Sequence, residues 1–116
     1  MQNNKENIVV DLSFQFAVEI IEFCDKLFEA RKFHVSNQLL KSGTSIGSNV
    51  REAQNAESKA DFIHKMKIAA KEADETEYWL LLCKHAKSYP DNDHLLESVI
   101  SIIKILSKII SSCKKC

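Results

Sequence analysis

Glycine and proline are scarce in this chain, which contains two glycines and one proline among 116 residues. Tight turns and β-hairpins rely on these residues, so their scarcity excludes a fold built from many short strands. Hydrophobic residues make up 45% and charged residues 28% of the sequence, which is typical of a folded domain rather than a disordered segment. The composition therefore predicts an all-α protein.

An excess of charge is also missing, because sixteen basic residues balance sixteen acidic ones. Without net charge, binding to nucleic acid or a membrane would depend on a local patch. Residues 1–7 are polar and lack the apolar core of a secretory signal, and the longest apolar run, residues 99–110, contains two lysines and is too short to span a bilayer. We therefore expect a cytoplasmic protein with no membrane partner.

Patterns of catalytic sites and metal centres are absent or weak. Two glycines leave no material for a Gly-rich phosphate loop, and no Glu-x-x-His pair of a di-iron bundle occurs. Asp61-x-x-His64 and Asp91-x-x-His94 have ligand spacing, but both fall where an Asp caps a helix. Cys113-x-x-Cys116 stands alone, without the second pair of a structural zinc site. We predict a non-enzymatic protein with no cofactor and no metal.

Apolar residues recur at helical spacing in four segments, approximately residues 10–31, 34–56, 59–87 and 92–114. The short connections between these segments favour antiparallel neighbours. We therefore expect a single domain over residues 1–116, folded as an up-and-down antiparallel four-helix bundle.

The last of these segments is the most apolar and has two parallel seams. The first is Leu95, Val99, Ile102, Leu106 and Ile109, and the second is Leu96, Ile100, Ile103 and Ile110. A helix in a four-helix monomer normally needs one apolar face, so the surplus predicts a homo-oligomer with Ile102, Leu106 and Ile109 in its interface. The alternative is that this helix lies deep in the core of its own chain.

Both glycines lie in the second segment, one helical turn apart. Glycine within a helix costs roughly 1 kcal/mol relative to alanine, so Gly43 and Gly47 predict a close approach of another helix. The small residues Ala69 and Ala73 of the third segment are the expected partners of this close packing. A kinked or interrupted helix is the alternative.

Polar residues form a second stripe on the same segment: Ser45, Asn49 and Glu52 follow one another at i, i+4 and i+7. Buried polar groups need partners, so we interpret this stripe as a hydrogen-bonded seam that sets helix register. The expected partners on the third segment are Lys71, Glu72 and Glu75. The same stripe would also suit the lining of a pocket or of the lumen of a ring.

Lysines gather on the last segment, which has no acidic residue after Glu97; they are Lys104, Lys108, Lys114 and Lys115. The third segment has a second group, Lys65, Lys67 and Lys71, which is offset by Asp74 and Glu75. These lysines are candidate nucleic-acid ligands, whose binding to phosphates would weaken steeply with salt. The alternative is an ordinary solvated face that ends in a basic turn favoured by the helix dipole.

The stretches QLLKSGTSIGSNVREA (38–53), SKADFI (58–63) and AKEADET (70–76) resemble those of the four helix bundle protein family, also called the S23 or 23S rRNA intervening-sequence protein family. Members of this bacterial family are similar to the accessory protein of diversity-generating retroelements, which forms a pentameric barrel and is thought to bind nucleic acid and a reverse transcriptase. The resemblance implies a homopentameric ring without catalysis. That accessory protein is markedly basic, whereas this chain is neutral.

Two functions remain open at this point. The first is a pentameric bundle that binds RNA or DNA, or a nucleic-acid-processing protein, through its lysines. The second is a scaffold or adaptor that recruits a protein partner and binds no nucleic acid. Only two arginines are present, Arg31 and Arg51, which favours the second function because arginine supplies most bidentate recognition of phosphates and bases.

Overall fold

The computed structural model describes residues 4–114, with side chains from residue 8 onward. It contains four helices, α1 (Asn4–Glu29), α2 (Phe33–Ala53), α3 (Lys59–His85) and α4 (Asp93–Lys114). No strand occurs within this described part of the chain. The predicted all-helical class and the four helices are confirmed.

Two helix ends differ from the prediction. Helix α1 begins at Asn4 rather than near residue 10, and its early turns bury Val9 completely. Helix α2 ends at Ala53 rather than near residue 56, because the next three amides bond to carbonyls only three residues back, as in a tightened final turn. Arg31 has a positive φ of 64°, a left-handed conformation that reverses the chain between α1 and α2.

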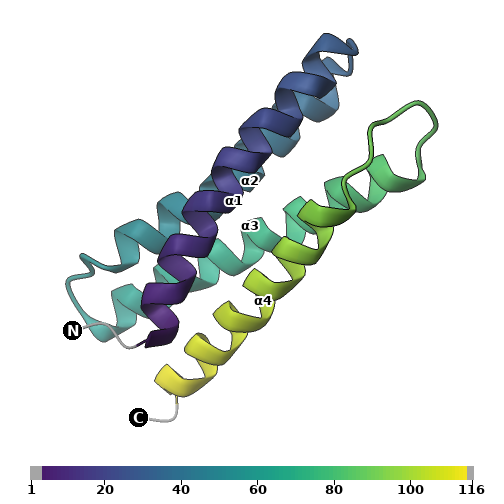
Figure 1. Cartoon of the computed structure of the whole chain (residues 1–116). Helices are drawn as coiled ribbons and strands as arrows, with labels where there is room; N and C mark the ends of the chain where they lie inside the picture. The colour runs from purple at the N-terminus through teal and green to yellow at the C-terminus, as the bar shows by residue number, and fades with distance from the viewer. Residues whose placement is uncertain (1–3, 115–116) are drawn as a thin grey trace.

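Consecutive helices run in opposite directions and form a bundle of 48 × 20 × 18 Å (Figure 1). Each helix packs on its neighbours in sequence, and α1 also packs on α4. Among the described residues, the diagonal pairs α1–α3 and α2–α4 make no comparable contact. The side formed by α1 and α2 therefore lies opposite the side formed by α3 and α4.

The core lies along the bundle axis and receives one stripe from each helix. Its largest fully buried side chains include Phe16, Ile20 and Leu27 of α1, Leu39 and Ile46 of α2, Met66 and Leu80 of α3, and Ile102 and Leu106 of α4. Ile102, Leu106 and Ile109 are at most 3% exposed within a single chain. The prediction that these three residues form an oligomer interface is therefore wrong, because α4 turns this seam into its own bundle.

The two glycines of α2 face α1 and not α3, so the predicted pairing with Ala69 and Ala73 is also wrong. A Cβ on Gly43 would lie 2.9 Å from the side chain of Ile20, and one on Gly47 would lie 3.1 Å from the backbone oxygen of Ser13. Helix α2 continues through both glycines without interruption. Ala69 and Ala73 are fully buried elsewhere in the core.

The α2–α3 and α3–α4 connections are held by side-chain hydrogen bonds. The amide of Asp61 donates to Ser58 Oγ at 3.0 Å, and the amide of Glu57 donates to Asp61 Oδ2 at 3.1 Å, so both residues cap the start of α3. Asn92, which precedes α4 and is buried, donates from Nδ2 to the backbone oxygen of Leu80 at 2.9 Å. This bond ties the start of α4 to α3.

Candidate functional site

The lysines singled out above lie on the two adjacent helices α3 and α4. Lys67 and Lys71 are exposed on α3, and Lys104, Lys108 and Lys114 are exposed on α4; Lys115 lies outside the described residues. We call the five described residues the lysine surface. Because α3 and α4 are antiparallel, the first half of α3 and the second half of α4 meet at one end of the bundle (Figure 1).

Helix packing brings two members of the lysine surface together across α3 and α4. The ammonium group of Lys114 lowers the pKa of Lys67, because two positive charges lie close to each other. The ion pairs of the described residues involve other groups, namely Lys65 with Glu52 at 3.0 Å, Lys84 with Asp93 at 3.2 Å and His94 with Glu19 at 3.2 Å. No carboxylate in the described part of the chain therefore forms a direct ion pair with the lysine surface, although Asp74 and Glu75 follow Lys71 on α3.

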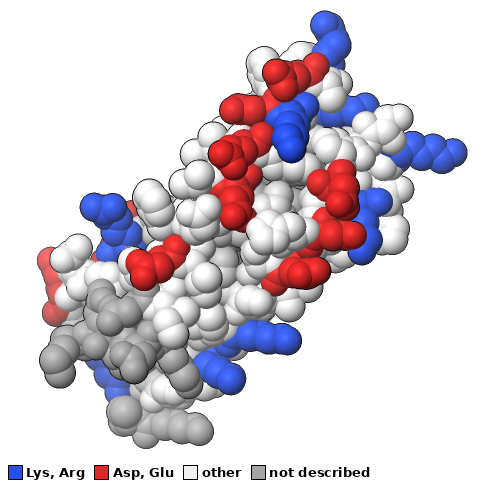
Figure 2. Space-filling model, in the orientation of Figure 1, with Lys and Arg blue, Asp and Glu red and all other residues white. Residues whose placement is uncertain are grey.

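Charge is unevenly distributed along the face that α1 and α4 present. Acidic side chains, with some basic ones among them, lie along α1 and around the start of α4, whereas basic side chains without acidic neighbours project from the second half of α4 (Figure 2). A groove of about 330 Å³ in this acidic region is lined by four carboxylates, those of Glu19, Glu22, Asp91 and Asp93, and also by Lys26 and His94. The neutral net charge thus conceals an acidic and a basic region.

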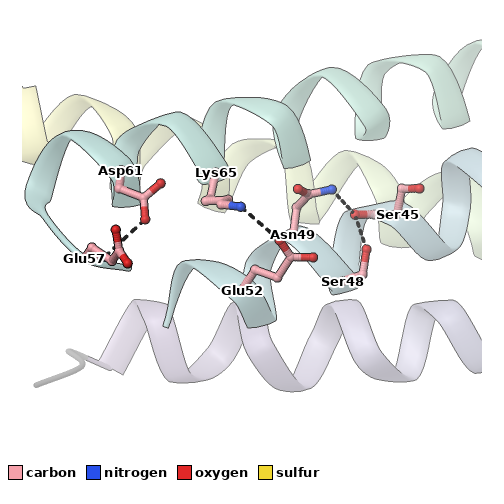
Figure 3. Close-up of polar contacts among 7 residues, drawn as sticks. All are labelled: Ser45, Ser48, Asn49, Glu52, Glu57, Asp61 and Lys65. Atoms are coloured by element: carbon pink, nitrogen blue, oxygen red, sulfur yellow. Dashed lines mark hydrogen bonds and ion pairs between the residues drawn. The ribbon is translucent and has the colours of Figure 1, made fainter. Parts of the chain in front are cut away.

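The predicted polar seam on α2 bonds mostly within its own helix (Figure 3). Ser45 Oγ donates to the backbone oxygen of Lys41 at 2.7 Å, and Asn49 Nδ2 donates to the backbone oxygen of Ser45 at 2.8 Å. Only Glu52 reaches α3, where it accepts a hydrogen bond from Lys65 that raises the pKa of this lysine. The expected partners Lys71, Glu72 and Glu75 were the wrong ones.

The buried polar contact between α2 and α3 joins Ser42 and Thr76 instead. Their hydroxyl oxygens are 3.0 Å apart, and both residues are at most 1% exposed. This pair was not predicted from the sequence, although each residue interrupts a core stripe of its helix. Ser42 lies between Leu39 and Ile46, and Thr76 lies between Ala73 and Leu80, so an inward-facing hydroxyl in each stripe was the available signal.

An apolar groove runs between α1 and α2 on the outside of the bundle. It encloses about 400 Å³ and is lined by Val10, Phe14, Ala17, Thr44, Gly47, Ser48 and Arg51. Phe14 in its lining is 65% exposed, and further along α1, outside the groove lining, Ile21 and Phe28 are 46% and 57% exposed. Among the described residues, α1 exposes five large apolar side chains and α4 only one, Ile100, so α4 carries little of the surplus apolar surface that the sequence indicated there.

A family model describing the 23S rRNA-intervening sequence protein matches residues 5–112. The chain belongs to the 23S rRNA-intervening sequence protein family. It is similar to the crystal structure of a protein of unknown function from the S23 ribosomal protein family of Bacteroides thetaiotaomicron VPI-5482, with 46% identity and a TM-score of 0.84. This match covers 92% of this chain and 98% of that chain. No curated protein matches the sequence.

The cysteines of this member of the 23S rRNA-intervening sequence protein family show no sign of a metal or redox site within the described residues. Cys24 and Cys83 are buried, and burial raises the pKa of each thiol to about 11. Cys113 is a half-buried thiol, and Cys116 lies outside the described residues. Within residues 4–114, no three His, Cys, Asp or Glu side chains are arranged to hold a metal ion, and no helix is long and apolar enough to cross a membrane.

Proposed function

We propose that this protein is a non-enzymatic homo-oligomer that binds RNA or DNA through the lysine surface. The observation that carries this proposal is a group of five exposed lysines on two adjacent helices, none of which forms an ion pair with a carboxylate of the described residues; within it, Lys114 lies close enough to Lys67 to lower the pKa of Lys67. Two ammonium groups held close together repel each other unless an anion lies between them. A phosphate group relieves this repulsion, so the arrangement favours a polyanion.

The chemistry of the lysine surface indicates which features of a nucleic acid it recognises. Lysine is a compact point charge that binds phosphate without reading bases, and Arg31 and Arg51 both lie on the opposite α1–α2 side. Binding is therefore independent of the nucleotide sequence of the RNA or DNA. Each phosphate contact contributes about −0.9 to the slope of log K against log salt for duplex DNA, and about −0.7 for a single strand.

Self-assembly strengthens this binding. One lysine surface offers few phosphate contacts, but copies held in one assembly bind a long polyanion jointly, at an effective concentration set by their spacing. The exposed apolar residues of α1 support such assembly, because an apolar patch of this kind marks a protein contact. A pentameric ring, as the family resemblance implies, would repeat the lysine surface five times.

Fluorescence anisotropy with a structured RNA of about 40 nucleotides tests the proposal across a KCl series from about 20 to 200 mM, a range over which phosphate-led binding weakens steeply. Lys104→Glu with Lys108→Glu should lower the affinity by about tenfold or more. The matched control is Lys26→Glu with Lys41→Glu, which makes the same change in charge at exposed lysines outside the lysine surface. Absence of binding at low salt, or equal losses in both variants, would reject nucleic-acid binding.

A protein-interaction scaffold that binds no nucleic acid is the second candidate. The α1–α2 groove favours it, because its apolar lining is typical of sites that contact protein rather than nucleic acid. Affinity purification from cells with and without nuclease separates the two functions. A protein partner retained after nuclease treatment supports the scaffold, whereas loss of every partner on nuclease treatment supports nucleic-acid binding.

A further inference from the structure

The acidic groove between α1 and the start of α4 has no part in the proposed binding of nucleic acid. It has a volume of about 330 Å³ and is lined by residues of α1 and by residues 91–95, which include the connection before α4. Because α4 begins at Asp93 and its lysines lie in its second half, the groove and the lysine surface are at different ends of α4. The groove is therefore a separate candidate site.

Carboxylates outnumber basic groups in the lining of this groove, which contains four carboxylates, one lysine and one histidine. Glu19 pairs with the histidine at 3.2 Å, and Asp93 pairs at 3.2 Å with Lys84, which lies outside the lining. Glu22 and Asp91 form no ion pair within the described part of the chain. A cation that enters the groove therefore meets two carboxylates without a basic partner.

An amide oxygen in the wall of the groove lacks a hydrogen-bond donor. Asn92 lines the groove and is 3% exposed, and its Nδ2 donates to the backbone oxygen of Leu80 at 2.9 Å. Its Oδ1 is buried and accepts no hydrogen bond from the described residues. Exchanging Oδ1 and Nδ2 would set two oxygens against each other at Leu80, so the orientation of the amide is fixed. Nearly all buried polar atoms in native proteins have a partner, so this oxygen points to a donor on a molecule bound in the groove.

The residues of the groove favour an alkylammonium ligand over a metal ion. An ammonium group carries three N–H donors and a positive charge, so it can donate to an amide oxygen and to a carboxylate together. Phe23 and Leu95, each 6% exposed, add apolar surface on which the methylene groups of such a ligand can lie. A metal ion needs several ligand atoms around one point, and no three His, Cys, Asp or Glu side chains within residues 4–114 are arranged to supply them.

We propose that this groove binds a linear polyamine. One ammonium group donates to Asn92 Oδ1, and the others pair with Glu22 and Asp91. A polyamine fits better than a single amine because its positive charges are spaced along a chain, as the carboxylates are spread over α1 and the connection before α4. A lysine side chain of another protein offers the same ammonium chemistry, and a lysine peptide distinguishes the two sources.

Isothermal titration calorimetry with spermidine, without nucleic acid, tests the proposal at about 0.15 M KCl, where the field of exposed charges is screened beyond about 8 Å. Glu22→Gln with Asp91→Asn should weaken spermidine binding by about tenfold or more, because two charge-assisted contacts are lost. Asp91→Asn keeps an oxygen that can accept from the amide of Asp93, so the start of α4 is retained. The matched control is Glu57→Gln with Asp74→Asn, which makes the same change in charge at exposed carboxylates outside the groove.

Two further comparisons test the amide oxygen and the ammonium chemistry. Asn92→Ala, with its helix content checked by circular dichroism, should weaken spermidine binding by about fivefold, because one hydrogen bond is lost. If this variant does not fold, the Glu22→Gln with Asp91→Asn variant still tests the site. Putrescine and Mg²⁺ carry the same charge, and putrescine should bind the wild type about tenfold more tightly or better.

Absence of spermidine binding to the wild type, or equal losses in the groove variant and its control, would overturn the proposal. Mg²⁺ binding as tight as putrescine binding would show that the groove attracts cations by charge alone. Acetyl-trilysine amide has the same charge as spermidine and should bind less tightly; if it binds about tenfold more tightly, the occupant is a lysine side chain and not a polyamine. None of these results affects the proposed nucleic-acid binding, because no variant changes the lysine surface.

Discussion

Gly47 marks a point where α2 lies against the backbone of α1. A Cβ at this position would lie 3.1 Å from the backbone oxygen of Ser13, which cannot rotate away as a side chain does. Alanine at Gly47 gains about 1 kcal/mol of helix propensity but introduces an overpacked contact that typically costs 1–3 kcal/mol. We expect Gly47→Ala to lower the free energy of unfolding by about 1 kcal/mol in chemical denaturation.

The control for this prediction is Asn37→Ala, at an exposed position of the same helix. It gains helix propensity without meeting another helix, so it should leave stability unchanged or raise it by a few tenths of a kcal/mol. If the Gly47→Ala variant has the same free energy of unfolding as the Asn37→Ala variant, α1 can move away from the new methyl group without loss of stability.

The two buried thiols make stability depend on alkaline pH. An unfolded thiol loses its proton near the ordinary pKa of 9.0, whereas burial holds the pKa of Cys24 and Cys83 at about 11 in the native state. Between pH 9 and pH 11 the native chain therefore binds more protons than the unfolded chain. Its free energy of unfolding falls as pH rises through this range, by roughly 1.4 kcal/mol per pKa unit and thiol.

Chemical denaturation at pH 8 and pH 10.5 measures this fall against Cys24→Ala with Cys83→Ala. The double variant should be less stable at pH 8, because it loses packing, but it should lose less stability than the wild type on going to pH 10.5. All other ionisable groups are the same in both proteins. The difference between their decreases in the free energy of unfolding therefore gives the contribution of the two thiols. Equal decreases in the free energy of unfolding in the two proteins would contradict a raised pKa for Cys24 and Cys83.

At the scale of the helices, the Ser42–Thr76 contact is the buried polar link between α2 and α3. The two hydroxyl groups lie 3.0 Å apart and replace apolar side chains in both core stripes. Removing one partner leaves the other buried with one contact fewer, and removing both restores an apolar seam. A double-mutant cycle with Ser42→Ala and Thr76→Val should therefore give a coupling free energy of about 0.5–1.5 kcal/mol. Additive effects would show that each hydroxyl is satisfied by its own helix.

Helical periodicity was sufficient to predict the four elements, because a stripe of apolar residues shows which residues share a face. It was not sufficient to assign partners to those faces. Gly43 and Gly47 have no side chain that would distinguish α1 from α3, and the seam containing Ile102 and Leu106 is equally compatible with a core and with an interface. The proximity of Lys67 and Lys114 depends on how α3 and α4 align, which a single sequence does not record.

For the whole molecule, the separation of charge matters more than the net charge of zero. Lys108 lies fifteen residues after Asp93 in α4, which is about 22 Å at 1.5 Å per residue. The Debye length is about 8 Å at 0.15 M salt. At physiological ionic strength, the carboxylates at the start of α4 are therefore too far away to neutralise the lysine surface.

This separation predicts unequal effects of equal changes in charge on RNA binding. Glu22→Gln with Asp25→Asn removes two negative charges from the acidic region and should change the affinity less than about twofold at 0.15 M KCl, because salt screens the field of these distant carboxylates. Lys104→Gln with Lys108→Gln removes two positive charges from the lysine surface and should lower the affinity by about tenfold and flatten the salt slope by about 1.5. At about 0.01 M salt, where the Debye length approaches 30 Å, the acidic-region variant should bind RNA more tightly than the wild type. Opposite effects of equal size at 0.15 M would mean that net charge, and not the lysine surface, controls binding.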